Sequence, residues 1–303
     1  MMSSTDHTPG GRGALAGHSV ARVGYGAMQL QRLRGDRDAA ERVVRRAVEL
    51  GVDHVDTAPF YGRGFVDVVL RDVLRPEDGV TVVSKVGAEA APAGAPFPVR
   101  VAQRPEQLRA GVEASLRGLG VERIDVVNLR RMDTPQRVPV PADQVVDLDD
   151  QLAVMLAMRD EGMIGAIGLS CVTPEVLRRA LSVGVACVQN PYSVVAREDE
   201  ELLRMCEEAE IPWVPFFPLG GGFPGAAKAG DAPVVRAVAD ELGITTSQVA
   251  LAWLLHHSPR TLLIPGTADV DHLEANLVAG AVDLDTETLH RLDAVGSRTA
   301  GND

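Results

Sequence analysis

Short apolar runs alternate with amphipathic stretches along most of the chain. The apolar runs are rich in Val and Ile, whereas the stretches between them repeat apolar residues every three or four positions, as in residues 38–51. Runs of the first kind are typical of strands buried on both faces, and stretches of the second kind are typical of helices that cover a sheet. Eight such strand and helix units can be counted between residues 20 and 280.

This alternation predicts a parallel sheet, because parallel neighbours need a crossover segment between them. Eight units in a chain of this length favour a closed (β/α)8 TIM barrel, formed as a single domain, over an open doubly wound sheet. Residues 245–259 have no strand before them and are predicted to form an additional helix. We assign residues 19–303 to the barrel and expect residues 1–18, which begin with a polar and glycine-rich run, to be disordered.

Three long linkers follow the third, fourth and seventh predicted strands, at residues 87–103, 130–146 and 218–230. Linkers of this length in a folded domain are typical of binding loops or of disordered segments. All three follow the carboxyl ends of strands, which is the face where barrel enzymes carry their active sites.

Polar residues stand at the ends of nearly all the predicted strands. One such residue would usually cap the following helix, but polar groups at several strand ends on one face of a barrel indicate a lined pocket. These residues are Asp56, Lys85, Asn128, Ser170, Gln189, Asn190 and the run of Pro265, Gly266 and Thr267.

Tyr61 follows Asp56 by five residues and is predicted to lie on a loop over this pocket. The ordinary pKa of tyrosine, about 10, makes it a weak acid near neutrality. A nearby ammonium from Lys85, held in place by Asp56, would favour the phenolate and lower that pKa. Each residue also has a plain structural explanation, with Tyr61 as packing and the other two as a buried ion pair. Together they predict a proton donor.

Five motifs, HVDTAPFYG, VSKVG, IGLS, CVQNPYS and LIPGTADVDHLEANL, resemble those of the aldo-keto reductases and occur in the same order. The resemblance extends from about residue 20 to residue 292. It implies a reductase of aldehydes or ketones that uses NADPH, with NADH as the alternative, and that has a catalytic set of Asp, Tyr, Lys and His. It assigns three of these roles to Asp56, Tyr61 and Lys85, with Tyr61 as the general acid.

The same resemblance implies residues for the cofactor. Ser170 and Gln189 would hold the carboxamide, Phe216 would stack on the nicotinamide, and Thr267 and Asn276 would reach the adenosine end. Further cofactor positions on the loops after the seventh and eighth strands are Pro218, Leu219, Gly220, Pro265, Gly266 and His272. The place where the family commonly carries cations for the 2′-phosphate holds Asp269 instead, so we expect NADPH with weak discrimination against NADH.

Two further residues on the fourth strand are candidates for contact with the substrate. The resemblance implies that Asn128 stands where most of the family has the catalytic histidine. The same replacement is found in bacterial reductases of the pyridoxal-reductase type. An amide donates an N–H but has no proton to titrate, so Asn128 is predicted to orient and polarise the substrate, or else to satisfy backbone groups at the strand end. Arg130 lies on the same side of the strand and is predicted either to meet an acidic or phenolate group of the substrate or to lie in solvent.

Composition limits the other possibilities. With 30 basic and 42 acidic residues the net charge is −12, which disfavours a nucleic-acid partner. No apolar run approaches the roughly 18 residues needed to cross a bilayer, and the three cysteines lack the spacing of a metal site. We therefore expect a cytoplasmic enzyme for a small carbonyl compound, without a metal and with its oligomeric state left open. The alternatives are a dehydratase or epimerase with a bound nicotinamide, and a nucleotide-sensing subunit.

Overall fold

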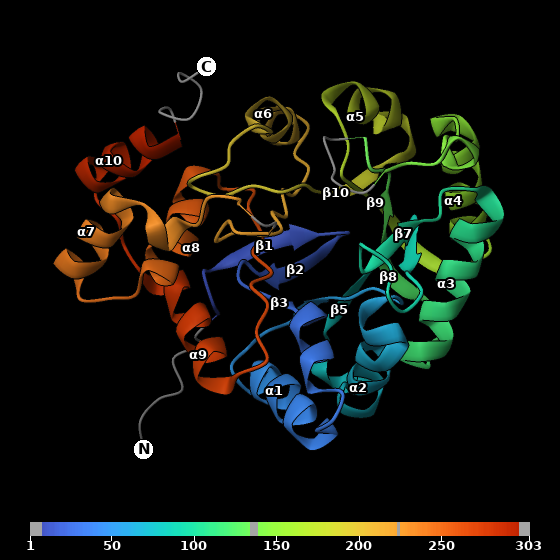
Figure 1. Cartoon of the computed structure of the whole chain (residues 1–303), viewed down its shortest axis with the longest axis horizontal. Helices are drawn as coiled ribbons and strands as arrows, with labels where there is room; N and C mark the ends of the chain where they lie inside the picture. The colour runs from blue at the N-terminus through green and yellow to red at the C-terminus, as the bar shows by residue number, and fades with distance from the viewer. Residues whose placement is uncertain (1–7, 134–138, 223–224, 297–303) are drawn as a thin grey trace.

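Short parallel strands form the centre of the molecule and helices surround them, as the computed structural model in Figure 1 shows. The structure describes residues 8–133, 139–222 and 225–296. Six strands form one parallel sheet in the order β10, β9, β8, β5, β4 and β3. Their bounds are β3 (Tyr25–Gly26), β4 (His54–Asp56), β5 (Thr81–Val86), β8 (Ile124–Arg130), β9 (Ile164–Ser170) and β10 (Val185–Gln189).

Two further segments close this sheet into a barrel. Trp213 forms parallel bridges with Val188 of β10 and with Thr261, and Leu263 forms a parallel bridge with Val23, two residues before β3. The segments that contain Trp213 and Leu263 are therefore the seventh and eighth strands. The prediction of a (β/α)8 barrel is confirmed by these pairings.

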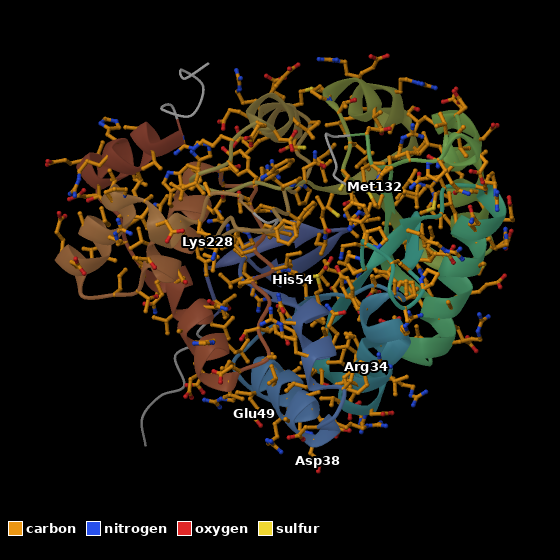
Figure 2. All side chains as sticks on the ribbon, viewed as in Figure 1. Arg34, Asp38, Glu49, His54, Met132 and Lys228 are labelled. Atoms are coloured by element: carbon orange, nitrogen blue, oxygen red, sulfur yellow. The ribbon has the colours of Figure 1, made fainter. Side chains whose placement is uncertain are left out.

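Helices cover the outside of the barrel (Figure 1). They are α1 (Arg37–Glu49), α2 (Phe65–Val73), α3 (Pro105–Leu119), α4 (Leu148–Asp160), α5 (Pro174–Ala180), α6 (Glu200–Glu208), α7 (Pro233–Leu242), α8 (Thr246–His257), α9 (Val270–Val278) and α10 (Thr286–Gly296). In α1, Val43 and Val44 are buried, whereas Asp38 and Glu49 point away from the barrel (Figure 2). This division into two faces is the amphipathic pattern expected for a helix packed on a sheet.

The additional helix predicted at residues 245–259 is α8. It begins with a capping box, in which the Thr245 side chain accepts a hydrogen bond from the Gln248 N–H and the Gln248 side chain accepts one from the Thr245 N–H. Residues 249–255 are all buried, because α8 lies between the barrel and α7 (Figure 1). The sequence pattern missed α10, whose one buried residue is Leu292, so its apolar periodicity is weak.

A hairpin of β1 (Arg12–Leu15) and β2 (His18–Ala21) covers the amino-terminal end of the barrel. The Ala21 N–H donates to Oδ1 of Asp53, the residue before β4, at 2.7 Å. Leu15 and Val20 pack with barrel residues such as Val83. The disorder predicted for residues 1–18 is therefore wrong for residues 12–18, because their apolar side chains close the barrel floor. Residues 1–7 lie outside the part that the structure describes.

The long linker at residues 87–103 contains an antiparallel pair of strands, β6 (Ala88–Ala90) and β7 (Val99–Val101). The other two predicted long linkers include residues 134–138 and 223–224, which lie outside the described residues. All three linkers follow strands at their carboxyl ends, as the sequence pattern predicted.

Candidate active site

A cavity lies at the carboxyl ends of the barrel strands, where the predicted strand-end residues converge. Twelve of the residues predicted from the sequence line it: Asp56, Tyr61, Lys85, Arg130, Ser170, Phe216, Pro218, Leu219, Gly220, Pro265, Gly266 and Asn276. Five other predicted residues, Asn128, Gln189, Asn190, Thr267 and His272, do not line it.

Asp56 and Lys85 form a buried ion pair at the base of this cavity. The Lys85 ammonium donates to Asp56 Oδ1 and also to the carbonyl oxygen of Thr57, which lies 3.2 Å away. Gln189 Nε2 donates to the second oxygen of Asp56 at 2.7 Å. Both carboxylate oxygens therefore have donors, which is the condition under which a buried charge is tolerated.

Tyr61 begins a short 3-10 helix (Tyr61–Gly64) that follows β4. Within this helix Gly62 and Arg63 have φ angles of 56° and 57°, in the left-handed region, so the chain turns sharply after the tyrosine. The Gly62 N–H donates to Gln31 Oε1 at 3.2 Å, which ties the turn to the 3-10 helix (Ala27–Leu33) that follows β3. The turn places Lys85 Nζ 5.2 Å from the centroid of the Tyr61 ring.

Burial and charge act in opposite directions on Tyr61. Burial raises the pKa of Tyr61, the positive charge of Lys85 lowers it, Asp56 raises it and Arg130 lowers it, and the net pKa lies above the ordinary value. Lys85 does act to lower the pKa of Tyr61, as predicted. The prediction that the pKa would lie below its ordinary value is wrong, because burial raises it more than Lys85 lowers it. Burial also disfavours the charged form of Lys85, but Asp56 and Tyr61 outweigh it and raise the pKa of Lys85. At neutral pH the site thus holds a neutral phenol beside an ammonium ion.

Asn128 faces the barrel interior and does not border the cavity. It pairs in register with Lys85 on one side and with Gly168 on the other. The side chain is fully buried, and its Oδ1 accepts a hydrogen bond from Cys187 Sγ at 3.2 Å. A Cβ atom at Gly168 would collide with this oxygen, so the amide occupies the space above the glycine. The Asn128 Nδ2 is buried and has no hydrogen-bond partner among the described residues, so the predicted contact of this donor with a substrate stays a prediction.

Arg130, two residues nearer the carboxyl end of β8, reaches the cavity instead. It pairs in register with Ser170 of β9, which also lines the cavity. The guanidinium carbon lies 5.8 Å from the centroid of the Phe216 ring. Of the two same-side residues that the sequence offered on this strand, the structure therefore brings Arg130 to Tyr61 and Lys85.

The polar groups around Ser170 fit a flat ring that carries a carboxamide. Gln189 Oε1 is buried and has no hydrogen-bond partner among the described residues, so an acceptor is available for an amide N–H. The Ser170 hydroxyl lines the same cavity, and the aromatic ring of Phe216 forms part of its wall. A hydroxyl, an amide oxygen and a ring face are the groups that a nicotinamide requires.

The loop after the eighth strand is held by hydrogen bonds of its own. The Tyr25 hydroxyl donates to the Thr267 carbonyl oxygen at 2.7 Å, and Thr267 Oγ1 accepts from the Asp269 N–H at 3.1 Å. Asp269 caps α9 by accepting from the His272 N–H at 2.9 Å. The His272 side chain is 79% exposed, so it points to solvent instead of into the cavity.

The sequence reasoning missed five residues that line the cavity: Gly26, Met28, Gln29, Phe217 and Ile264. Gly26 ends β3, and Met28 and Gln29 lie two and three residues after it. The same strand-end rule, applied to the first strand, would have found these three. A Cβ atom at Gly26 would meet the carbonyl oxygen of Ile264, so this glycine allows the first and eighth strands to approach each other.

A metal-binding cluster and a membrane-spanning helix are both absent from the described residues. No group of three or more His, Cys, Asp or Glu side chains is arranged to hold a metal ion there. No helix in those ranges has the length and apolar character required to cross a bilayer.

Comparison with known proteins places this geometry in context. The sequence profile of the aldo/keto reductase family matches residues 22–297. A pyridoxine 4-dehydrogenase from Escherichia coli is 39% identical over 288 residues, which cover 93% of this chain and 96% of that protein. An oxidoreductase from Schizosaccharomyces pombe is 35% identical, over 97% of this chain and 92% of that protein.

Solved structures show the same fold at lower identity. A thermostable aldo-keto reductase in complex with the inhibitor epalrestat superposes with a TM-score of 0.77 at 24% identity, over 94% of this chain and 99% of that one. An aldo-keto reductase from Klebsiella pneumoniae in complex with NADPH superposes with a TM-score of 0.75 at 24% identity, over 94% and 95% of the two chains.

Proposed function

Because the chain belongs to the aldo/keto reductase family, we propose that it reduces a small aldehyde or ketone to an alcohol, with NADPH as the hydride donor and Tyr61 as the proton donor. The observation that carries this proposal is the arrangement of Tyr61, Lys85 and Asp56 in one cavity at the carboxyl ends of the strands. A neutral phenol beside a fixed cation is suited to give a proton to an oxygen on which negative charge develops.

The side chains divide the work of the reaction. The nicotinamide, when bound, supplies the hydride to the carbonyl carbon. Tyr61 donates its hydroxyl proton to the carbonyl oxygen, and the ammonium of Lys85 stabilises the phenolate that remains. Asp56 holds Lys85 in position through their ion pair. The raised pKa of Tyr61 keeps the hydroxyl protonated at neutral pH, so the proton is present when the substrate arrives.

We assign the cofactor to residues on three strand ends and two loops. Ser170 and Gln189 would hold the carboxamide, and Phe216 would stack on the ring. The loop residues 218–220, 265 and 266 line the cavity and would follow the remainder of the dinucleotide, and Thr267 and Asn276 would reach its adenosine end. Support for NADPH comes from the family and from the Klebsiella pneumoniae relative that was solved with it.

The substrate that we propose is a flat aldehyde, with pyridoxal among the candidates. The relative from Escherichia coli is named for the oxidation of pyridoxine at position 4, and the reverse of that reaction is the reduction of an aromatic aldehyde.

The test is a panel of aldehydes, including pyridoxal and benzaldehyde, assayed by the oxidation of NADPH. Tyr61→Phe is expected to reduce kcat by about 10²-fold or more and to leave the Kd of NADPH nearly unchanged. The matched control is Tyr192→Phe, since the Tyr192 hydroxyl contacts Glu200 and His257 and does not line the cavity. Turnover of Tyr61→Phe close to that of the parent, with the chemical step limiting, would refute the assignment.

A further inference from the structure

The cavity carries one positive charge that no acidic side chain balances. Lys85 is paired with Asp56 at its base. Arg130 lines the same cavity, and no Asp or Glu of the described residues forms an ion pair with it. Its Nε atom is buried and has no hydrogen-bond partner among those residues. The neighbouring Arg131, by contrast, pairs with Asp133 at 2.7 Å.

An unpaired, partly buried guanidinium is costly unless something else meets its charge. Arginine remains charged at all physiological pH values, so it cannot lose a proton to relieve that cost. Its planar set of N–H donors matches the geometry of a carboxylate or another anionic oxygen. The cavity is thus complementary in charge to an anion.

The backbone under Arg130 is fixed by a buried network of glutamine side chains. Gln103 Nε2 donates to the carbonyl oxygens of Arg130 and of Gly87, each at 2.6 Å. Gln151 Nε2 donates in turn to Gln103 Oε1 at 2.8 Å. Both glutamines are almost fully buried. This network holds the end of β8, so the guanidinium is carried by a rigid element and is preorganised for binding.

Arg130 also faces the same small volume as the proton donor. Among the influences on the pKa of Tyr61, burial raises it most, and the charges of Lys85 and Arg130 oppose that rise. The Phe216 ring lies 5.8 Å from the guanidinium carbon and borders the cavity between the strand ends. A substrate with its carbonyl group at Tyr61 would therefore have a substituent near Arg130.

We propose that Arg130 forms an anion-recognising subsite beside Tyr61, so that the preferred substrates are aldehydes that carry an anionic oxygen, a carboxylate or a phenolate, near the carbonyl group. This inference rests on the proposed carbonyl reduction and specifies the class of substrate. The anion meets the charge of Arg130, and the same contact aligns the carbonyl oxygen with the Tyr61 hydroxyl.

The experiment compares benzaldehyde with 2-, 3- and 4-carboxybenzaldehyde at pH 7, where the carboxyl group of each is ionised. In the parent, kcat/KM for at least one carboxybenzaldehyde should exceed that for benzaldehyde. Arg130→Met should reduce this preference by about tenfold or more, the effect of losing a charge-assisted hydrogen bond. Arg130→Lys should keep part of it. Arg109→Met is the matched control and should retain the parental ratio, since Arg109 pairs with Glu161 at 2.7 Å and does not line the cavity.

Binding gives a readout that does not depend on turnover. The parent with NADP⁺ should bind benzoate more tightly than benzamide, and Arg130→Met should lose that difference. Three results would overturn the proposal: no preference for any anionic compound in the parent, a preference that survives in Arg130→Met, or an equal loss on neutral and anionic aldehydes. A loss of NADPH affinity in Arg130→Met with an unchanged preference would assign the arginine to the cofactor and would also overturn it. Failure of the parent to reduce any aldehyde, with benzoate still preferred, would refute the proposed function alone.

Discussion

His54 should make the fold sensitive to mild acid. The residue begins β4 and lies near the centre of the ring of helices, where its ring packs against Gly24 (Figure 2). Burial lowers its pKa from 6.5 to about 4, although Asp53 and Asp56 act in the opposite direction. In the unfolded chain the imidazole takes up a proton near its ordinary pKa, whereas in the folded protein it stays neutral.

The sign and size of the effect follow from this difference. Because the folded pKa is the lower one, the contribution to stability is complete above about pH 6.5 and is lost as the pH falls toward 4. At about 1.36 kcal/mol for each pKa unit, the loss amounts to about 3 kcal/mol. Asp67 acts in the opposite sense, because burial raises its pKa from 3.8 to about 6 and the fold gains stability as that carboxyl takes up its proton.

The assay is urea unfolding, under reversible conditions, of the parent and of His54→Phe and His54→Gln between pH 7 and pH 4.5. The comparison uses the slope of the unfolding free energy against pH, so the cost of either substitution at a single pH does not enter. Both variants should lose less stability than the parent over this range. His290→Gln, at an exposed position, should have the slope of the parent. Parallel curves for the parent and both His54 variants would refute the reasoning.

Three further predictions concern the barrel floor, the strand interior and the cofactor. Leu15→Asp places a carboxylate in the apolar contact under the barrel and should lower the free energy of unfolding by about 3 kcal/mol or more. Arg12→Ala, at an exposed position of the same hairpin, should lower it by less than about 1 kcal/mol. Urea unfolding measures both changes. Asn128→Ala should reduce transition-state stabilisation by less than about 1 kcal/mol, because the amide does not line the cavity. The measurement is kcat/KM on benzaldehyde. A loss of about 1.5–4 kcal/mol would instead show that Asn128 donates a hydrogen bond to the substrate. The preference for NADPH over NADH in kcat/KM should stay below about 10³-fold, because Asp269 stands where the family carries cations, and a larger value would show that cations outside this loop bind the 2′-phosphate.

The sequence determined the features that depend on local spacing. The alternation of apolar runs and amphipathic stretches is enough to predict eight strand and helix units, because burial on one face or on both faces sets the period of the pattern. In a parallel barrel all carboxyl ends lie on one face, so the polar residues at strand ends were expected to converge, and Asp56, Lys85 and Ser170 do so. Tyr61 could be placed with them because only five residues separate it from Asp56.

The tertiary structure decided what depends on contacts between distant segments. Asn128 and Arg130 have the same side-chain parity on β8, and only the packed structure shows that Arg130 lines the cavity while Asn128 does not. The pKa of Tyr61 depends on how deeply its ring is buried, and the spacing of residues in the sequence does not predict that burial. The hairpin under the barrel and the glutamines under Arg130 are likewise fixed by partners far along the chain. Sequence periodicity reports on each helix or strand separately. The register between strands, the burial of a side chain and the pairing of its charge are set only when the elements pack together.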